Sequence, residues 1–471
     1  MSDQTLHHGM KPQRGMNKRA TGSADPRRFA DLFPNLPRMI TDPRILEELG
    51  ELGGAMDEAG GGVGDTTTPL GFVFFGQFID HDMTLDVTSS FNRVNDPDAI
   101  RNFRTPTLDL DCIYGNGLEA SPYLYYHAPP GASDFQRSID MRHLLTNEDD
   151  LVRALSESET NPHRIALIGD PRNDENRVIS QLQLAMHRFH NAVVDYIVSE
   201  GKYEGPEVLE EAQRLTRWHY QWVVVHDFLV RMVGQKLVDD ILCNGGKVYP
   251  QAAESLGGPF MPTEFAVAAF RFGHTMVREP FAYNDTHNEV ELFGPELGGG
   301  FRANEAGKID WSKMFGNTAQ AAGSVDTKLP SGLLDLPFVR EGDVKSLASR
   351  NLLRSQSFGL PSGQSVHKAL SEACGEVLPS PDLGNADLKL PQNIQDCTPL
   401  WLYILAEGTL TGGQRLGPVG GRIVAETIIG LLELDNTSYL GANRSWRPNP
   451  EFIGENDDWD MVALLKFAGV L

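Results

Sequence analysis

The sequence predicts a mainly α-helical protein, built as one large helical domain with little β structure, and three observations favour this fold class. Apolar residues recur at intervals of three and four over several long stretches, as on one face of an amphipathic helix. Strand-like alternation is rare and short, and no fixed-period repeat is present. With 40% hydrophobic and 22% charged residues, the 471-residue chain has enough apolar side chain for a sizeable core.

The predicted elements follow one another along the chain. Residues 1–28 are polar, contain six Lys or Arg against two Asp, and are expected to form a flexible tail before a domain spanning residues 29–471. The segment 53–68, rich in Gly, Asp and Thr, is expected to be a loop. Beyond it, the apolar spacing predicts helices over 178–197, 208–242, 263–277, 344–353 and 422–434.

Composition and charge exclude several classes of protein. The 41 Lys and Arg against 64 Asp and Glu give a net charge of −23, which repels phosphate backbones, so no nucleic-acid partner is expected. Four cysteines without a CxxC pair argue against structural zinc and against a disulfide scaffold. No apolar signal-type region opens the chain and no run of about 18 apolar residues occurs, so we expect a soluble protein without a membrane span, cytoplasmic or exported without a Sec-type signal peptide.

Two motifs place ionisable groups in unusual surroundings. Gly76-Gln-Phe-Ile-Asp-His-Asp82 follows an apolar stretch, and burial of its three ionisable groups requires a metal, a covalent bond or a polar partner; a solvated surface cluster is the plainer reading. Gly169-Asp-Pro-Arg-Asn-Asp-Glu-Asn176 opens the helix predicted over 178–197. Its Arg172 and Glu175 are three residues apart, and a salt bridge near a helix N-terminus would also explain them.

Two further motifs suggest ligands. His274 lies in the apolar helical stretch Ala269-Phe-Arg-Phe-Gly-His-Thr275, where it is either a packing residue or a metal ligand. Gly273 beside it costs a helix about 1 kcal/mol relative to Ala, which the close approach of a flat ligand would explain. In the segment 105–111, oxygen-bearing side chains alternate, so an extended loop would point them to one side; they suit calcium, although a solvated acidic loop is the alternative.

In this order, and followed by Leu347-Ala-Ser-Arg-Asn-Leu-Leu-Arg-Ser355, the motifs resemble those of the animal-type haem peroxidases of the peroxidase–cyclooxygenase superfamily, particularly the bacterial members. The resemblance covers roughly residues 30–430. It implies one helical peroxidase domain that binds haem b and calcium.

The resemblance also implies a role for individual residues. His81 corresponds to the distal catalytic histidine, with Gln77 one helical turn before it, and Arg172 to the distal arginine. His274 corresponds to the proximal ligand of the haem iron, and Asn351 to the residue that accepts a hydrogen bond from its other ring nitrogen.

The remaining assignments concern attachment of the cofactors. Asp80 and Glu175 correspond to carboxylates that form ester bonds to haem, and Arg271 to an arginine near a haem propionate. The calcium ligands implied by the resemblance are Asp82, Thr105, Thr107 (through its backbone carbonyl), Asp109 and Asp111.

Three features depart from the family pattern. Asn176 stands where some members carry a methionine that forms a sulfonium link to haem, so this third link is expected to be absent. The segment Arg354-Ser-Gln-Ser-Phe-Gly359 replaces the usual R-S-R-D-H-G, and the disulfides of the secreted animal members are missing.

The function implied is that of a peroxidase, which reduces hydrogen peroxide through a ferryl intermediate and oxidises small anionic or aromatic donors: halide, thiocyanate or small phenols. Iodide, thiocyanate and bromide are expected to be better donors than chloride, because Asn176 cannot form the sulfonium link. A haem-dependent fatty-acid dioxygenase is the alternative, which Arg271 disfavours because those enzymes carry a radical-forming tyrosine at this position. A matrix protein that binds haem without using it is a third reading, but no adhesive module is visible.

Overall fold

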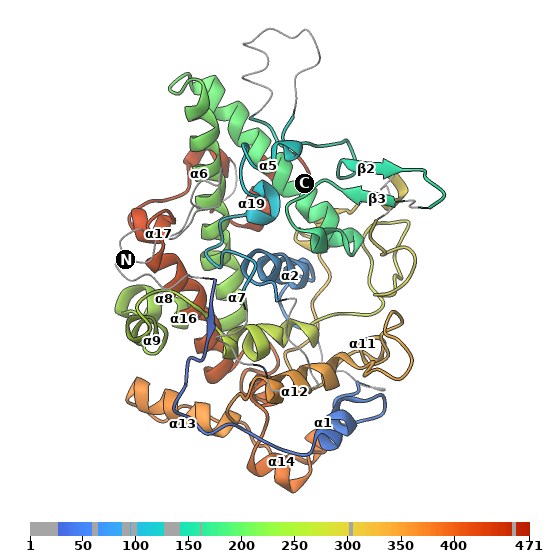
Figure 1. Ribbon diagram of the computed structural model, residues 1–471, viewed down its shortest axis with the longest axis vertical. Coiled ribbons are helices and arrows are strands. Elements are labelled where there is room, and N and C mark those ends of the chain that lie inside the picture. Colours follow the sequence, from blue (N-terminus) through green and yellow to red (C-terminus); the bar gives the residue numbers. More distant parts are fainter. Residues whose placement is uncertain are drawn as a thin grey trace.

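The computed structural model describes residues 27–58, 65–86, 95, 101–126, 142–160, 163–300, 305–454 and 458–471, and within these residues helices dominate (Figure 1). Two sheets of two strands are present. β1 (Phe29–Ala30) pairs in parallel with β4 (Met261–Pro262), and β2 (Arg153–Ser156) pairs antiparallel with β3 (His163–Ala166). The predicted mainly α fold class is therefore confirmed.

Of the predicted tail, residues 1–26 lie outside the described residues, whereas Arg28 belongs to the folded body. Arg28 forms an isolated bridge with Arg101, and its Nη2 donates to the carbonyl of Leu256 at 2.7 Å. One large cluster of buried apolar side chains extends from Phe29 to Ala468. In the described part of the chain, no helix is both long enough and apolar enough to cross a bilayer.

The helix α2 (Gly71–Met83) lies near the middle of the molecule in Figure 1 and packs against α5 (Arg177–Glu200). Phe75 and Phe78 are fully buried, and each ring meets the ring of Tyr220 edge-on, at 6.1 and 6.0 Å between centroids. A Cβ at Gly71 would lie 2.7 Å from the carbonyl oxygen of Met314, so only glycine allows this approach. These contacts hold the polar end of α2 inside the protein.

The predicted helix over 178–197 corresponds to α5, whose N-cap Asn176 accepts the N–H of Ile179 at 2.9 Å. The predicted helix over 208–242 is divided into α6 (Pro206–Val223), the π-helical turn η4 (Val224–Phe228), α7 (Leu229–Val233) and α8 (Gln235–Asn244). Gly234, with φ of 92°, separates the last two. The predicted helix over 263–277 is irregular: a π turn, η5 (Glu264–Ala268), is followed by the 3₁₀ turn η6 (Ala269–His274).

The other long helices confirm two further predictions: α12 (Leu347–Ser357) covers most of 344–353, and α16 (Pro418–Leu434) contains 422–434. The remaining elements are α1 (Pro43–Gly50), α3 (Asp111–Tyr114), η2 (Pro122–Leu124), η3 (Pro171–Asp174), α9 (Tyr249–Ser255), η7 (Glu305–Gly307), α10 (Trp311–Met314), α11 (Ser331–Leu334), α13 (Gly363–Cys374), η8 (Ala386–Leu388), α14 (Gln392–Asp396), α15 (Leu400–Ala406), η9 (Glu407–Thr411), α17 (Tyr439–Ala442), α18 (Pro450–Ile453) and α19 (Met461–Phe467).

Candidate active site

A cavity of about 680 Å³ lies between α2 and η6, and it brings together residues from distant parts of the sequence. Its walls are largely apolar, with side chains such as Phe74, Phe228 and Phe272. The polar side chains predicted for the haem site that line it are Gln77, Asp80, His81, Glu175, Arg271 and His274. A mainly apolar cavity with a few converging polar groups is the usual form of a cofactor site.

His81 lies in the last turn of α2 and is only 5% exposed. Its Nδ1 is 2.7 Å from Oδ1 of Asn173, whose Nδ2 donates to Oε1 of Gln183 at 2.7 Å. Gln183 in turn donates Nε2 to the carbonyl of Cys112 at 3.0 Å. Because a backbone carbonyl only accepts, it fixes the direction of every hydrogen bond in this series. The Asn173 oxygen therefore accepts from His81, so Nδ1 of His81 carries a proton and Nε2 is the basic nitrogen.

The charge state of His81 suits a proton acceptor. Burial lowers its pKa, and the charge of Arg172 lowers it further, against opposing contributions from Asp80, Asn173 and Asp170. The ring is therefore neutral near pH 7.

Gln77 and Glu175 form a polar cluster beside the histidine. Gln77 donates Nε2 to Oε1 of Glu175, and that oxygen lies 3.7 Å from Nε2 of His81. Asn176, besides capping α5, donates Nδ2 to Oε1 of Gln77 at 3.3 Å. Burial raises the pKa of Glu175, although Arg172 and Gln77 oppose the shift. Asp80 faces the same cavity and accepts a hydrogen bond from Oγ1 of Thr84 at 2.8 Å.

Arg172 sits in the 3₁₀ turn η3, behind His81 rather than on the cavity wall. Its Nη2 donates to the backbone carbonyl of His81 at 2.9 Å and to Oδ2 of Asp170 at 2.7 Å. Asp170 is fully buried. In this arrangement Arg172 holds the backbone of His81 by a hydrogen bond, and its side chain is not part of the cavity wall.

His274 ends η6, and its Nδ1 lies 2.9 Å from Nδ2 of Asn351 on α12. The predicted pair is present, but the hydrogen bond runs opposite to the prediction. Nη1 of Arg271 is 3.4 Å from Oδ1 of Asn351, and an arginine only donates, so the amide oxygen faces Arg271 and the amide nitrogen faces the ring. Burial, followed by the charge of Arg271, lowers the pKa of His274 to about 3, so the ring is neutral.

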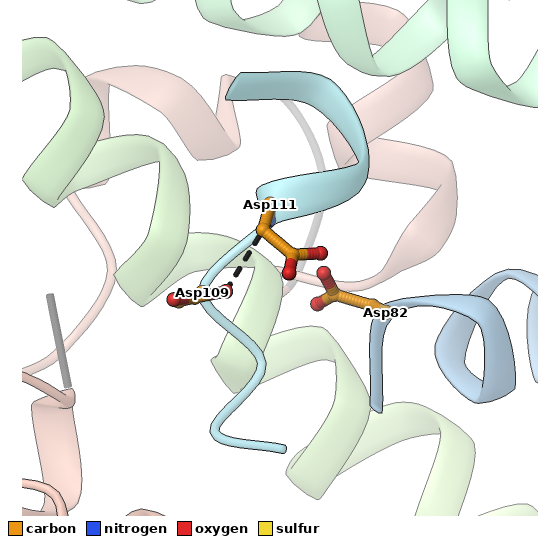
Figure 2. A group of neighbouring side chains, drawn as sticks. All are labelled: Asp82, Asp109 and Asp111. Atoms are coloured by element: carbon orange, nitrogen blue, oxygen red, sulfur yellow. Dashed lines mark hydrogen bonds between the residues drawn. The ribbon is translucent and has the colours of Figure 1, made fainter. Parts of the chain in front are cut away.

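The carboxylates of Asp82, Asp109 and Asp111, here called the carboxylate cluster, offer oxygens within 4.8 Å of one another. Figure 2 shows Asp82, at the end of α2, with its carboxylate directed toward that of Asp111. Burial and the charge of Asp111 raise the pKa of Asp82 to about 7, and burial raises that of Asp111 to about 6, against the charge of Arg104. Such a cluster is stable in its charged form only with a cation.

The segment between these carboxylates is not the extended loop that the alternating pattern predicts. Leu108 and Leu110 have φ values of 54° and 60°, in the left-handed region that leucine rarely adopts. The chain therefore curls around the cluster. Thr105 and Thr107 are buried in it, and Oγ1 of Thr107 has no hydrogen-bond partner among the described residues.

Three residues with clear roles were missed by the sequence analysis: Asn173, Asp170 and Arg104. Asn173 and Asp170 flank Arg172 inside a motif that was recognised, so their closeness to a catalytic candidate was the available signal. Arg104 precedes the calcium-type segment by one residue, and nothing in the sequence indicates that it reaches Asp170.

Comparison with known proteins adds the family. The animal haem peroxidase family model matches residues 89–373, more than half of the chain, with His81 just outside the match. A peroxidase-like protein of Margaritifera margaritifera is 25% identical over 256 residues, 45% of this chain and 32% of that protein. A peroxidasin homolog of Caenorhabditis briggsae is 25% identical over 371 residues, 73% of this chain and 26% of that protein. The chain thus spans about a quarter to a third of the length of these relatives.

Among solved structures, Peroxidase A from Dictyostelium discoideum matches with a TM-score of 0.61 at 15% identity, over 94% of this chain and 91% of that chain. A fatty acid alpha-dioxygenase from Arabidopsis thaliana matches with a TM-score of 0.56 at 14% identity, over 92% and 74%. At these identities the likeness concerns the fold.

Proposed function

Because the chain belongs to the animal haem peroxidase family, we propose that it is a haem peroxidase that reduces hydrogen peroxide and oxidises small anionic or aromatic donors. The observation that carries the proposal is the cavity itself. It holds two neutral histidines on opposite elements, and each is bound at Nδ1 by a side-chain amide.

The cavity fits a flat macrocycle. A Cβ at Gly273 would meet nothing within 4 Å, so the wall beside His274 is open, and the surrounding surface is apolar. When bound, haem would supply the redox chemistry of the reaction. His274 would ligate its iron, Arg271 would pair with a propionate, and Asp80 and Glu175 would be the carboxylates available for ester bonds.

Ligation through Nε2 of His274 requires the proton to be on Nδ1, so the amide of Asn351 must make a half-turn and present its oxygen. Arg271 now holds that oxygen. Pairing of Arg271 with a carboxylate of the cofactor would release the amide, so the same residue would answer both requirements.

The carboxylate cluster fits calcium by the chemistry of its donors. Oδ1 of Asp82 is buried and has no hydrogen-bond partner among the described residues, which leaves it available to a cation. Hard oxygen donors from carboxylates, threonines and a backbone carbonyl are the ligands that calcium prefers. We propose the site at Asp82, Asp109, Asp111, Thr105 and Thr107.

On the distal side, the residues of the chain move the proton. Nε2 of His81 takes a proton from hydrogen peroxide and returns it to the departing oxygen, acting first as base and then as acid. The positive charge of Arg172 favours the negative charge that develops as the O–O bond breaks. Gln77 orients the polar side of the pocket through Glu175.

The mouth of the cavity favours aromatic donors. Phe293 and Phe338 meet edge-on there with centroids 5.6 Å apart, and Phe338 is 71% exposed. Aromatic rings dock well against such a pair. Among anions, we propose that iodide, thiocyanate and bromide are oxidised and that chloride is poor, because Asn176 offers no sulfur for a third haem link.

The electronic spectrum of the haem-loaded protein, before and after one equivalent of hydrogen peroxide, tests the proposal. A haem band that changes on peroxide addition, together with turnover of a phenol such as guaiacol and of bromide, is expected. Haem binding without any reaction with peroxide would refute the peroxidase.

The likeness to a fatty acid alpha-dioxygenase supports a second candidate at the level of fold alone. The residue three positions before His274 is Arg271, and no tyrosine lines the described part of the cavity. Oxygen uptake with palmitate in the absence of peroxide would favour this alternative.

A further inference from the structure

Arg104 joins the carboxylate cluster to the distal side of the cavity through one buried guanidinium. Its Nη1 donates to Oδ1 of Asp111 at 3.0 Å, and its Nη2 lies 2.8 Å from Oδ2 of Asp170. The side chain of Arg104 is 10% exposed and that of Asp170 is fully buried. Charge-assisted contacts that are shielded from water are strong and only weakly screened. A change in the charge or position of one carboxylate therefore alters the interaction of Arg104 with the other.

Asp170 binds Arg172 as well as Arg104. It is the N-cap of η3: its Oδ1 accepts the backbone N–H of Arg172 at 2.9 Å, and its Oδ2 accepts from Nη2 at 2.7 Å. The same Nη2 donates to the carbonyl of His81 at 2.9 Å. An unbroken series of ion pairs and hydrogen bonds therefore runs from Asp111 through Arg104 and Asp170 to Arg172, which in turn binds the backbone of His81.

The segment that carries Arg104 is also attached to the end of α2. The fully buried Asn102 accepts the N–H groups of Leu85 and Arg104 at 2.8 and 3.1 Å, and it donates to the carbonyl of Met83 at 2.7 Å. Asp82 is the residue before Met83. A shift of the cluster relative to α2 therefore moves Arg104 as well.

We propose that Arg104 is a positioning residue that couples cation binding at the carboxylate cluster to the placement of Arg172. The inference rests on the proposed function, since it assigns the cluster to a cation and Arg172 to the distal side. Without an ion, Arg104 divides its charge between Asp111 and Asp170. A divalent cation competes with Arg104 for Asp111. Arg104 then interacts more strongly with Asp170.

Reciprocity provides a test that needs no catalytic activity, because coupling between two sites acts equally in both directions. Calcium binding to the haem-loaded chain is measured by titration calorimetry in wild type, Asp170→Asn, Arg104→Gln and the double variant. Asp170→Asn leaves Arg104 to Asp111 alone and should weaken calcium binding. Arg104→Gln removes a competing cation and should tighten it, whereas a merely structural residue would weaken it.

The coupling is the difference between the two backgrounds. Asp170→Asn should raise the calcium Kd by a factor at least about threefold larger when Arg104 is present than in the Arg104→Gln background. Equal factors in both backgrounds, or no calcium binding in wild type, would overturn the proposal. Arg44→Gln, an exposed change on α1, is the matched control.

If Arg104→Gln does not fold, Arg104→Lys takes its place. Lysine keeps the competing charge, so no tighter calcium binding is expected, but it lacks the fork that reaches two carboxylates, so the factor caused by Asp170→Asn should still fall. In kinetic assays, Arg104→Gln should lower kcat/KM for peroxide and leave the KM for the donor unchanged. Arg104→Lys should restore part of the lost kcat/KM. A wild type without peroxidase activity but with the calorimetric coupling would refute the proposed function and leave the coupling intact.

Discussion

The replacement Asn173→Asp tests how His81, the proposed distal histidine, is held. Oδ1 of Asn173 is 2.7 Å from Nδ1 of His81, and the two residues are 0% and 5% exposed. A carboxylate there would favour the imidazolium. Two unit charges about 4 Å apart interact by about 4 kcal/mol at an effective dielectric constant near 20, an upper value that corresponds to about three pH units. A single opposite charge typically shifts a pKa by about 1–3 pH units.

The sign of the effect follows from the proposed role of His81 as a base, which must be neutral to accept a proton. A raised pKa keeps the ring protonated to higher pH, so the acid limb of the rate of reaction with peroxide should move up by about 1–3 pH units. Stopped-flow absorbance measured across the pH range gives this limb directly. The exposed change Asn393→Asp adds the same charge elsewhere and should leave the limb in place.

Two further results bear on the reasoning. Asn173→Ala leaves the Nδ1 proton without its acceptor, so a loss of about 1–3 kcal/mol in stability is expected without a rise in the limb. Superimposable acid limbs in wild type and Asn173→Asp, with both proteins folded by thermal unfolding, would show that Asn173 does not contact the catalytic form of His81.

Three other predictions concern the cofactors. His274→Ala should lose haem on gel filtration, seen as loss of the haem absorption band; retention of the band would reverse the proximal assignment. In the presence of a chelator, thermal stability should fall as the pH rises from about 4 to 7, because burial raises the pKa of Asp82 to about 7 and the native state holds a proton that the unfolded state has released. The slope is about 1.4 kcal/mol per pH unit for each such carboxylate, and calcium should abolish it; an identical slope with calcium would contradict the site. After peroxide treatment, mass spectrometry of denatured protein should find haem attached, with one link fewer in Asp80→Asn and in Glu175→Gln; fully extractable haem in wild type would count against both esters.

The sequence was informative where function depends on residues close together along the chain. Helical spacing predicted α5 and α16, and the motifs containing His81 and His274 proved to line one cavity. The prediction of an extended backbone over residues 105–111 was wrong. Alternating side chains point to one side only if the backbone is extended, and Leu108 has a left-handed conformation. Contacts across long separations, such as that between Arg104 and Asp170, leave no periodic signal.

The two histidines also show why hydrogen-bond direction could not be predicted from residue types. Each ring meets an amide, but the amide takes its direction from a third group. For His81 that group is ultimately the carbonyl of Cys112, which cannot change its character, so the distal tautomer is set by the fold alone.

For His274 the third group is Arg271, a charged side chain that also faces the cavity. If His274 binds iron as proposed, we expect the required tautomer to be favoured when a carboxylate draws Arg271 away from Asn351. A cofactor that lacks carboxylates should consequently bind more weakly to this chain than its loss of ion pairs alone explains. Comparing haem with its dimethyl ester in wild type and in Arg271→Leu separates the two effects: the ester should be disfavoured in wild type and much less so in Arg271→Leu. An equal preference for haem in both proteins would mean that Arg271 does not control the amide.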